Sequence, residues 1–175
     1  MKILMFVIMG FMLLTINCKK DKKDDILSIS RTPYTGTELR INGYYYSTWE
    51  DMIYIMFFYR NGIHLNGGGF PKSELVDYET EYKNGTFYNH VKEWKYMWGV
   101  FKIEGNKIFF ERWYSSEPPL KAFVCDGNII NDTTFNITES YRMQNGEKTM
   151  VSTINEIYYF KQFSPKPDST NSFVQ

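Results

Sequence analysis

The sequence contains few of the residues that stabilise or equip many small domains. Among 175 residues there are two cysteines, Cys18 and Cys125, and two histidines, His64 and His90. Charge of neither sign is in excess, since 20 basic residues face 20 acidic ones. Nucleic-acid-binding proteins concentrate basic residues on one face, so this balance argues against nucleic acid as a partner.

The usual signals of catalysis are also missing. No cluster of His, Cys, Asp or Glu has metal-ligand spacing, and there is no Gly-x-Ser-x-Gly motif. The glycines of residues 67–69 are not followed by Lys-Ser/Thr, so we interpret them as a flexible hinge. His64 and His90 are interpreted as solvated or structurally bonded residues, and Cys125 as a small buried hydrophobe. We therefore predict a non-enzymatic protein with no catalytic residues, metal or cofactor.

A hydrophobic run long enough to span a bilayer is absent as well. Residues 3–14 form an uncharged apolar stretch of 12 residues after Lys2. Crossing the hydrocarbon core takes about 20 residues as a helix. The stretch instead has the length of a signal-peptide core, and we predict that residues 1–17 are a signal peptide.

A lone cysteine and a block of charge follow this segment. Residues 15–18, Thr-Ile-Asn-Cys, resemble the lipobox of bacterial lipoproteins. The resemblance implies acylation of Cys18, with chains such as palmitate, and attachment to the lipid bilayer of the cell envelope, with the outer membrane favoured. Residues 18–30 would then be the lipidated cysteine and a charged, flexible tether. An ordinary Cys18 after a plain signal peptide, or a short anchor formed by residues 1–17, are the alternatives.

The remainder of the chain is rich in aromatic residues and hairpin turns, both typical of β-structure. Phe, Tyr and Trp make up 18% of the sequence. We expect strands at residues 38–47, 52–60, 63–65, 98–103, 107–114, 120–125, 133–142 and 150–163. Eight short strands in sequence order predict an all-β, eight-stranded antiparallel up-and-down barrel over residues 31–163, with an open sandwich as the alternative. Residues 164–175 are a tail that follows the barrel or projects from it.

A helical pattern interrupts the strands between the third and the fourth. Apolar residues recur at helical spacing within residues 73–82 and again within residues 86–97. We expect a short helical insertion here and hypothesise that it caps the mouth of the barrel.

Four stretches resemble lipocalin-like β-barrel lipoproteins of bacteria, a group that is largely uncharacterised in function. They are GYYY at 43–46, FYRNG at 58–62, WGVFKIEGNKIFFERW at 98–113 and YYFKQFSPKPDSTNSFV at 158–174. The resemblance extends over residues 39–175. It implies a barrel that holds one small apolar ligand, or a filled barrel that serves as a scaffold.

The apolar residues of the second and third strands suggest where such a ligand would bind. A two-residue Asn61-Gly62 turn would pair Phe58 with Leu65 and place both on one interior face. The predicted ligand-contacting residues are Met56, Phe58, Leu65, Trp98 and Trp113. We expect binding of a small apolar or amphipathic ligand; the alternative is a surface protein with a filled core that binds a protein or glycan partner.

Overall fold

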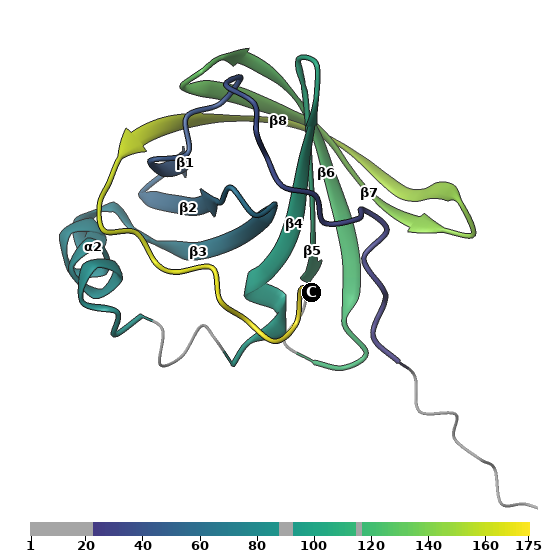
Figure 1. Cartoon of the computed structure of the whole chain (residues 1–175), viewed down its shortest axis with the longest axis horizontal. Coiled ribbons are helices and arrows are strands. Elements are labelled where there is room, and N and C mark those ends of the chain that lie inside the picture. Colours follow the sequence, from purple (N-terminus) through teal and green to yellow (C-terminus); the bar gives the residue numbers. More distant parts are fainter. Residues whose placement is uncertain (1–22, 88–92, 115–116) are drawn as a thin grey trace, which may run out of the picture.

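The computed structural model of the chain describes residues 23–87, 93–114 and 117–175, and its eight strands form a closed antiparallel barrel (Figure 1). The strands are β1 (Gly43–Trp49), β2 (Met52–Phe58), β3 (Ile63–Pro71), β4 (Trp98–Glu104), β5 (Lys107–Tyr114), β6 (Lys121–Asn131), β7 (Thr134–Gln144) and β8 (Glu147–Gln162). Each strand pairs with the next, and β8 pairs with β1. The predicted up-and-down barrel is confirmed, and the open sandwich is wrong. The predicted signal peptide, Cys18 and residues 19–22 lie outside the described residues.

Strand β2 is apolar on both faces because it separates two hydrophobic cores. Met56 and Phe58 point into the barrel and belong to an inner core. Ile55 and Phe57 point outward and belong to an outer core. The register between β2 and β3 shifts between Ile55 and Met56, where β3 contains one extra residue, Gly67, next to Gly68 with its φ of +94°. The excess of aromatic residues in the sequence therefore fills two cores rather than one.

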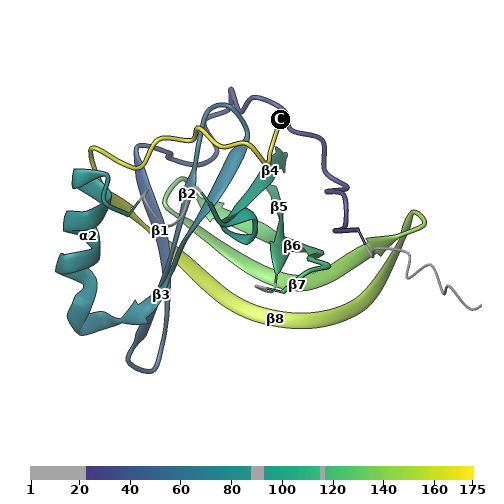
Figure 2. The same ribbon diagram turned by 90° about the horizontal axis from the view of Figure 1, so that it is seen from below.

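Helix α2 (Leu75–Asn84) covers the outer face of β1–β3, as Figures 1 and 2 show. Its Tyr82 is buried against the ring of Phe57, with the ring centroids 5.2 Å apart, and its hydroxyl donates to the Gly67 carbonyl at 2.6 Å. A Cβ at Gly67 would lie 3.0 Å from that hydroxyl, so glycine permits the close approach. Burying a side chain of this size contributes about 1.5–3 kcal/mol.

The helical insertion between β3 and β4 is thus confirmed, but α2 does not cap the mouth. The hypothesis was wrong because the outer faces of β1–β3 are themselves apolar and need a cover. The second predicted helix falls partly on residues 88–92, outside the described part of the chain. Around that gap the chain forms turns and a short 3-10 helix, η2 (Lys95–Met97); another, η1 (Lys72–Glu74), precedes α2. Within the described residues, no helix is long and apolar enough to cross a membrane.

The segment before β1 crosses the outer wall at β5 and β6. The main-chain N–H of Asp25 donates to the Leu120 carbonyl at 2.9 Å, and its carboxylate accepts from the Ala122 N–H and from Arg142. Farther along, buried Glu111 accepts from the N–H of Ile29 at 2.7 Å. The prediction of a flexible tether is therefore wrong for residues 24–30, which pack on the barrel.

The tail after β8 also packs on the barrel. It runs across the outer face of β2–β4, and its end lies near β5 (Figure 1). Phe163 and Val174 are buried in the outer core. We expected residues 164–175 either to follow the barrel or to project from it. The structure shows that they follow the barrel.

Two segments that the sequence analysis placed outside the expected strands lie inside strands. The chain continues through Asp126-Gly127 as part of β6, with a register shift against β7 at this point. A Cβ at Gly127 would lie 2.3 Å from the Asn136 carbonyl oxygen, so glycine here serves close strand packing rather than a turn. The glycines of residues 67–69 likewise belong to β3.

Candidate functional site

One half of the barrel interior is filled by side chains. Phe58 is its central ring, 4.8 Å from Phe101 and 5.3 Å from His64. Tyr34 and Leu39, from the segment before β1, close this end of the barrel. The inner core consists of Tyr34, Leu39, Tyr45, Met56, Phe58, Phe101, Ile108, Phe110, Cys125, Phe135, Ile137 and Tyr158. A ligand therefore cannot occupy this half without displacing packed rings.

The opposite end of the barrel is open. β1 pairs with β8 only from Gly43 to Tyr46, and β3 pairs with β4 only from Ile63 to Leu65. Past these points β1–β3 are no longer paired with the rest of the barrel wall. We call the resulting cavity of about 650 Å³ the mouth pocket. It is lined by Ser47, Thr48, Trp49, Tyr54, Arg112, Tyr114, Asn155, Glu156, Ile157, Tyr158 and Tyr159.

Charged and hydroxyl groups converge in the mouth pocket. The Glu156 carboxylate accepts hydrogen bonds from the hydroxyls of Ser47 at 2.5 Å and Tyr158 at 2.9 Å. The Arg112 guanidinium lies 3.9 Å from the centre of the Tyr114 ring and donates to the Tyr96 carbonyl at 3.2 Å. Burial raises the pKa of Tyr114 and of Tyr158, so both phenols stay protonated at physiological pH. The pocket thus combines aromatic faces with one cation and one hydrogen-bonded carboxylate.

His64 lies deeper in the interior, between the inner core and Arg112. In the sheet, Gly99 of β4 pairs with His64 of β3 on one side and with Arg112 of β5 on the other, so it lies between these two residues. The imidazole packs between Phe58 and Phe110 and forms no hydrogen bond within the described part of the chain. Burial, with the nearby Arg112 charge, holds the pKa of His64 well below its usual value. The expectation of a solvated or structurally bonded histidine is wrong for His64; His90 lies outside the described residues.

The five predicted ligand-contacting residues do not come together in one cavity. Met56 and Phe58 lie in the inner core, whereas Leu65, Trp98 and Trp113 lie in the outer core. None of the five lines the mouth pocket.

The register of the β2–β3 hairpin explains the error for Leu65. Phe58 pairs with His64, and Phe57 pairs with Leu65. The connection has three residues, Arg60-Asn61-Gly62, rather than the predicted two, and Gly62 has a φ of +81°. A shift of one residue turns every side chain of a strand to the other face.

Cys125 agrees with its interpretation as a buried hydrophobe. It belongs to the inner core, and its sulfur lies 3.7 Å from the Tyr114 hydroxyl. Burial raises the pKa of the thiol, which disfavours the reactive thiolate.

The charged residues of the mouth pocket were missed by the sequence analysis. Arg112 and Tyr114 continue the alternation that places Ile108 and Phe110 in the barrel. Glu156 precedes the buried Tyr158 by two residues on β8, so alternation places its side chain on the inward face as well. A charged residue on the inward face of a strand was the signal that could have identified them.

Comparison with known protein families, with curated proteins and with solved structures finds no match to this chain. The resemblance to lipocalin-like lipoproteins stays a prediction, and the function is inferred from the residues of the chain itself.

Proposed function

We propose that this protein is a non-enzymatic binding protein that holds a small amphipathic ligand in the mouth pocket. The observation that carries the proposal is a cavity of about 650 Å³ at the one open end of a barrel whose other end is packed. Pockets for small molecules commonly measure about 300–1,000 Å³ and combine aromatic walls with a few polar groups.

The lining indicates the class of ligand. Tyr54, Tyr114 and Tyr158 offer aromatic surface for an apolar body, and Trp49 stands at the rim with 69% of its surface exposed. Arg112 can bind an acceptor on the ligand, because a guanidinium has five N–H donors and its hydrogen bond to the Tyr96 carbonyl uses one of them. An amphipathic ligand with an acceptor or anionic group satisfies both parts of the pocket.

We also propose that Cys18 is acylated and attaches the barrel to the cell envelope, with the outer membrane favoured. The lipobox-like residues 15–18 support this proposal. Among the described residues Asp24 is the first to form a hydrogen bond with the barrel, and five residues separate it from Cys18. Five residues span at most about 18 Å, so the barrel would lie close to the bilayer.

Incorporation of a radioactive fatty acid tests the attachment. Label on the wild-type chain and its loss in Cys18→Ala would support acylation, whereas equal labelling of both chains would refute it.

The alternative is a scaffold that presents its surface to a protein or glycan. It is favoured by the filled inner core and by exposed aromatic residues beside the mouth, Trp49 and Tyr159, the latter 48% exposed. A partner would cover these side chains without entering the barrel.

Binding of 1-anilinonaphthalene-8-sulfonate, an aromatic anion that becomes fluorescent in apolar sites, tests the mouth pocket. We expect saturable binding that Arg112→Gln weakens about tenfold, the value of one hydrogen bond to a charged group. Lys102→Gln is the matched control, since Lys102 is exposed and paired with Glu104. Unchanged binding in a folded Arg112→Gln variant would contradict the proposal and favour the scaffold.

A further inference from the structure

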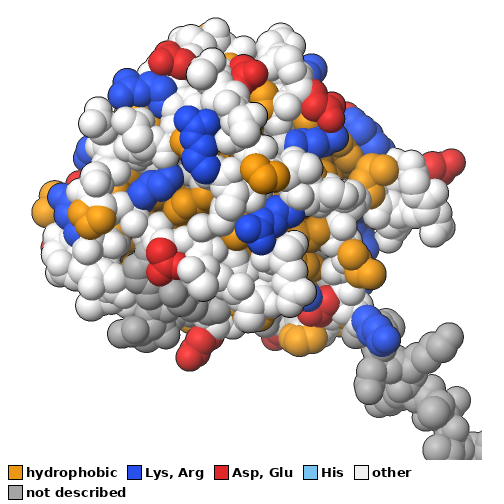
Figure 3. All heavy atoms as spheres, in the orientation of Figure 1, with side chains coloured by type: hydrophobic (Ala, Val, Ile, Leu, Met, Phe, Trp, Pro, Cys, Tyr) orange, Lys and Arg blue, Asp and Glu red, His pale blue; other side chains and the backbone are white. Residues whose placement is uncertain are grey.

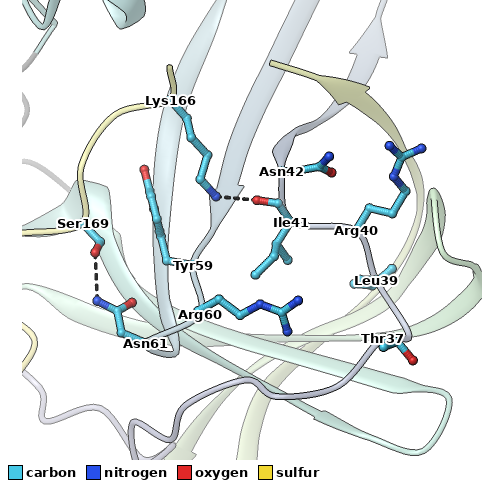
Figure 4. Close-up of a pocket in the computed structure, with 10 residues that line it drawn as sticks. All are labelled: Thr37, Leu39, Arg40, Ile41, Asn42, Tyr59, Arg60, Asn61, Lys166 and Ser169. Atoms are coloured by element: carbon cyan, nitrogen blue, oxygen red, sulfur yellow. Dashed lines mark hydrogen bonds between the residues drawn. The ribbon is translucent and has the colours of Figure 1, made fainter. Parts of the chain in front are cut away.

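A second cavity lies at the closed end of the barrel, opposite the mouth pocket (Figure 4). Its volume is about 750 Å³. Three segments far apart in the sequence form it: the stretch before β1, the β2–β3 connection and the C-terminal tail. It is lined by Thr37, Leu39, Arg40, Ile41, Asn42, Tyr59, Arg60, Asn61, Lys166 and Ser169, and we call it the basic pocket.

The charged residues of the basic pocket all have the same sign. Arg40, Arg60 and Lys166 line it, and no Asp or Glu does. Across the described ranges, none of these three cations forms an ion pair with a carboxylate. On this face of the molecule, Lys and Arg side chains gather in the middle and acidic ones lie mainly around the edge (Figure 3). The cluster is therefore a local excess of positive charge in a chain with no net charge.

Lys166 is the most deeply placed of the three. Its ammonium donates to the carbonyls of Ile41 at 2.6 Å and Phe58 at 2.7 Å and lies 4.3 Å from the centre of the Tyr59 ring. Burial, together with the charge of Arg60, lowers the pKa of Lys166 to about 8. An ammonium has three donors, so one remains for a further acceptor.

The two arginines are also held by neutral groups. Arg60 donates to the Gly36 carbonyl at 2.9 Å and to the Tyr34 carbonyl at 3.3 Å through a single nitrogen. Arg40 makes one long hydrogen bond, 3.4 Å, to the amide oxygen of Gln162, and its guanidinium lies 4.7 Å from the centre of the Phe160 ring. Glu38, the acidic residue two positions before Arg40, accepts instead from the Tyr34 hydroxyl. Donors of both guanidiniums are thus left to bind an anion.

Apolar side chains complete the basic pocket. Leu39 and Ile41 lie on one side and the Tyr59 ring on the other (Figure 4). A bare inorganic ion would not contact the apolar part of this lining. We propose that the basic pocket binds an organic anion in which a carboxylate or phosphate group is attached to a short apolar body.

The proposal is tested on the full chain by NMR of 13C-labelled lysine side chains, with the Lys166 Cε signal as the readout. Octanoate and octyl phosphate are the probes, octanol is the uncharged control, and inorganic phosphate is the control without an apolar body. We expect saturable shifts of the Lys166 signal with the two amphipathic anions and a rise in the pKa of Lys166 when either binds. Octanol and inorganic phosphate should each bind at least about tenfold more weakly.

Arg40→Gln is the informative variant because the side chain of Arg40 makes one long hydrogen bond and one contact with the Phe160 ring, so we expect the fold to be retained. It should weaken octanoate binding about tenfold, whereas Lys102→Gln should leave it unchanged. Binding of only one amphipathic anion would support the proposal and identify the head group. No saturable shift, equal binding of octanol or inorganic phosphate, or unchanged affinity in Arg40→Gln would each overturn it. Because the readout lies at the closed end, these results are independent of binding in the mouth pocket.

Discussion

Replacing Phe58 with alanine tests whether the inner core is filled. Phe58 is 1% exposed, and its ring centroid lies 4.8–6.1 Å from those of Tyr45, His64, Phe101, Phe110 and Phe135. Truncating a packed phenylalanine typically costs about 3–5 kcal/mol. Since the surrounding rings come from five different strands and cannot all collapse into the space, we expect about 4–5 kcal/mol for Phe58→Ala.

Urea denaturation followed by circular dichroism measures this loss. At about 2–4 °C per kcal/mol for a domain of this size, the same loss should lower the melting temperature by about 8–20 °C. Trp49→Ala is the control, because its exposed ring should change the free energy of unfolding by less than about 0.5 kcal/mol. A loss below about 1 kcal/mol for Phe58→Ala would refute the filled core and indicate a hollow barrel.

Three other substitutions test the packing around the barrel. In Gly99→Ala the new Cβ would lie 2.1 Å from the Glu111 carbonyl oxygen, so we expect a loss above about 3 kcal/mol in thermal melts. Asp25→Asn leaves the partly buried Arg142 without its carboxylate and should lower the free energy of unfolding in urea by about 1.5–3 kcal/mol. An unchanged urea midpoint would show that residues 24–30 do not pack on the barrel. Burial raises the pKa of Glu111, and hydrogen bonds from Ile29 and Ser28 only partly offset this effect. The folded chain therefore binds this proton more tightly than the unfolded chain, and stability from this group declines as the pH rises above its usual pKa of 4.5. Glu111→Gln should abolish that decline, and a decline of equal size in both proteins would contradict the assignment.

The strand pattern was predictable because alternation and turn residues are local signals. The turn Gly105-Asn106, for example, joins β4 to β5 between the two strands expected at residues 98–103 and 107–114. The register of the β2–β3 hairpin was harder to predict. A three-residue connection, Arg60-Asn61-Gly62, and a two-residue Asn61-Gly62 turn have the same sequence and differ only in their backbone angles. The Asp126-Gly127 pair has the letters of a turn too, but its glycine accommodates a neighbouring carbonyl that only the folded sheet brings near.

Contacts between distant segments account for the remaining differences. In the sequence, Asp24 and Asp25 were interpreted as part of a solvated tether. Their hydrogen-bond partners lie about a hundred positions away in the sequence and are Leu120, Ala122 and Arg142. Helix α2 was identified by its spacing, but its docking surface depends on the outward face of β1–β3. The basic pocket is formed by three segments in the same way, and no local pattern indicates it.

Native mass spectrometry of the full chain, purified gently from its own host, tests the central claim most directly. The account predicts a discrete mass beyond that of the covalent protein that dissociates on mild activation and is reduced in Arg112→Gln. A wild-type protein that carries no such mass, even after incubation with a lipid and metabolite extract of the host, would contradict ligand binding in the mouth pocket.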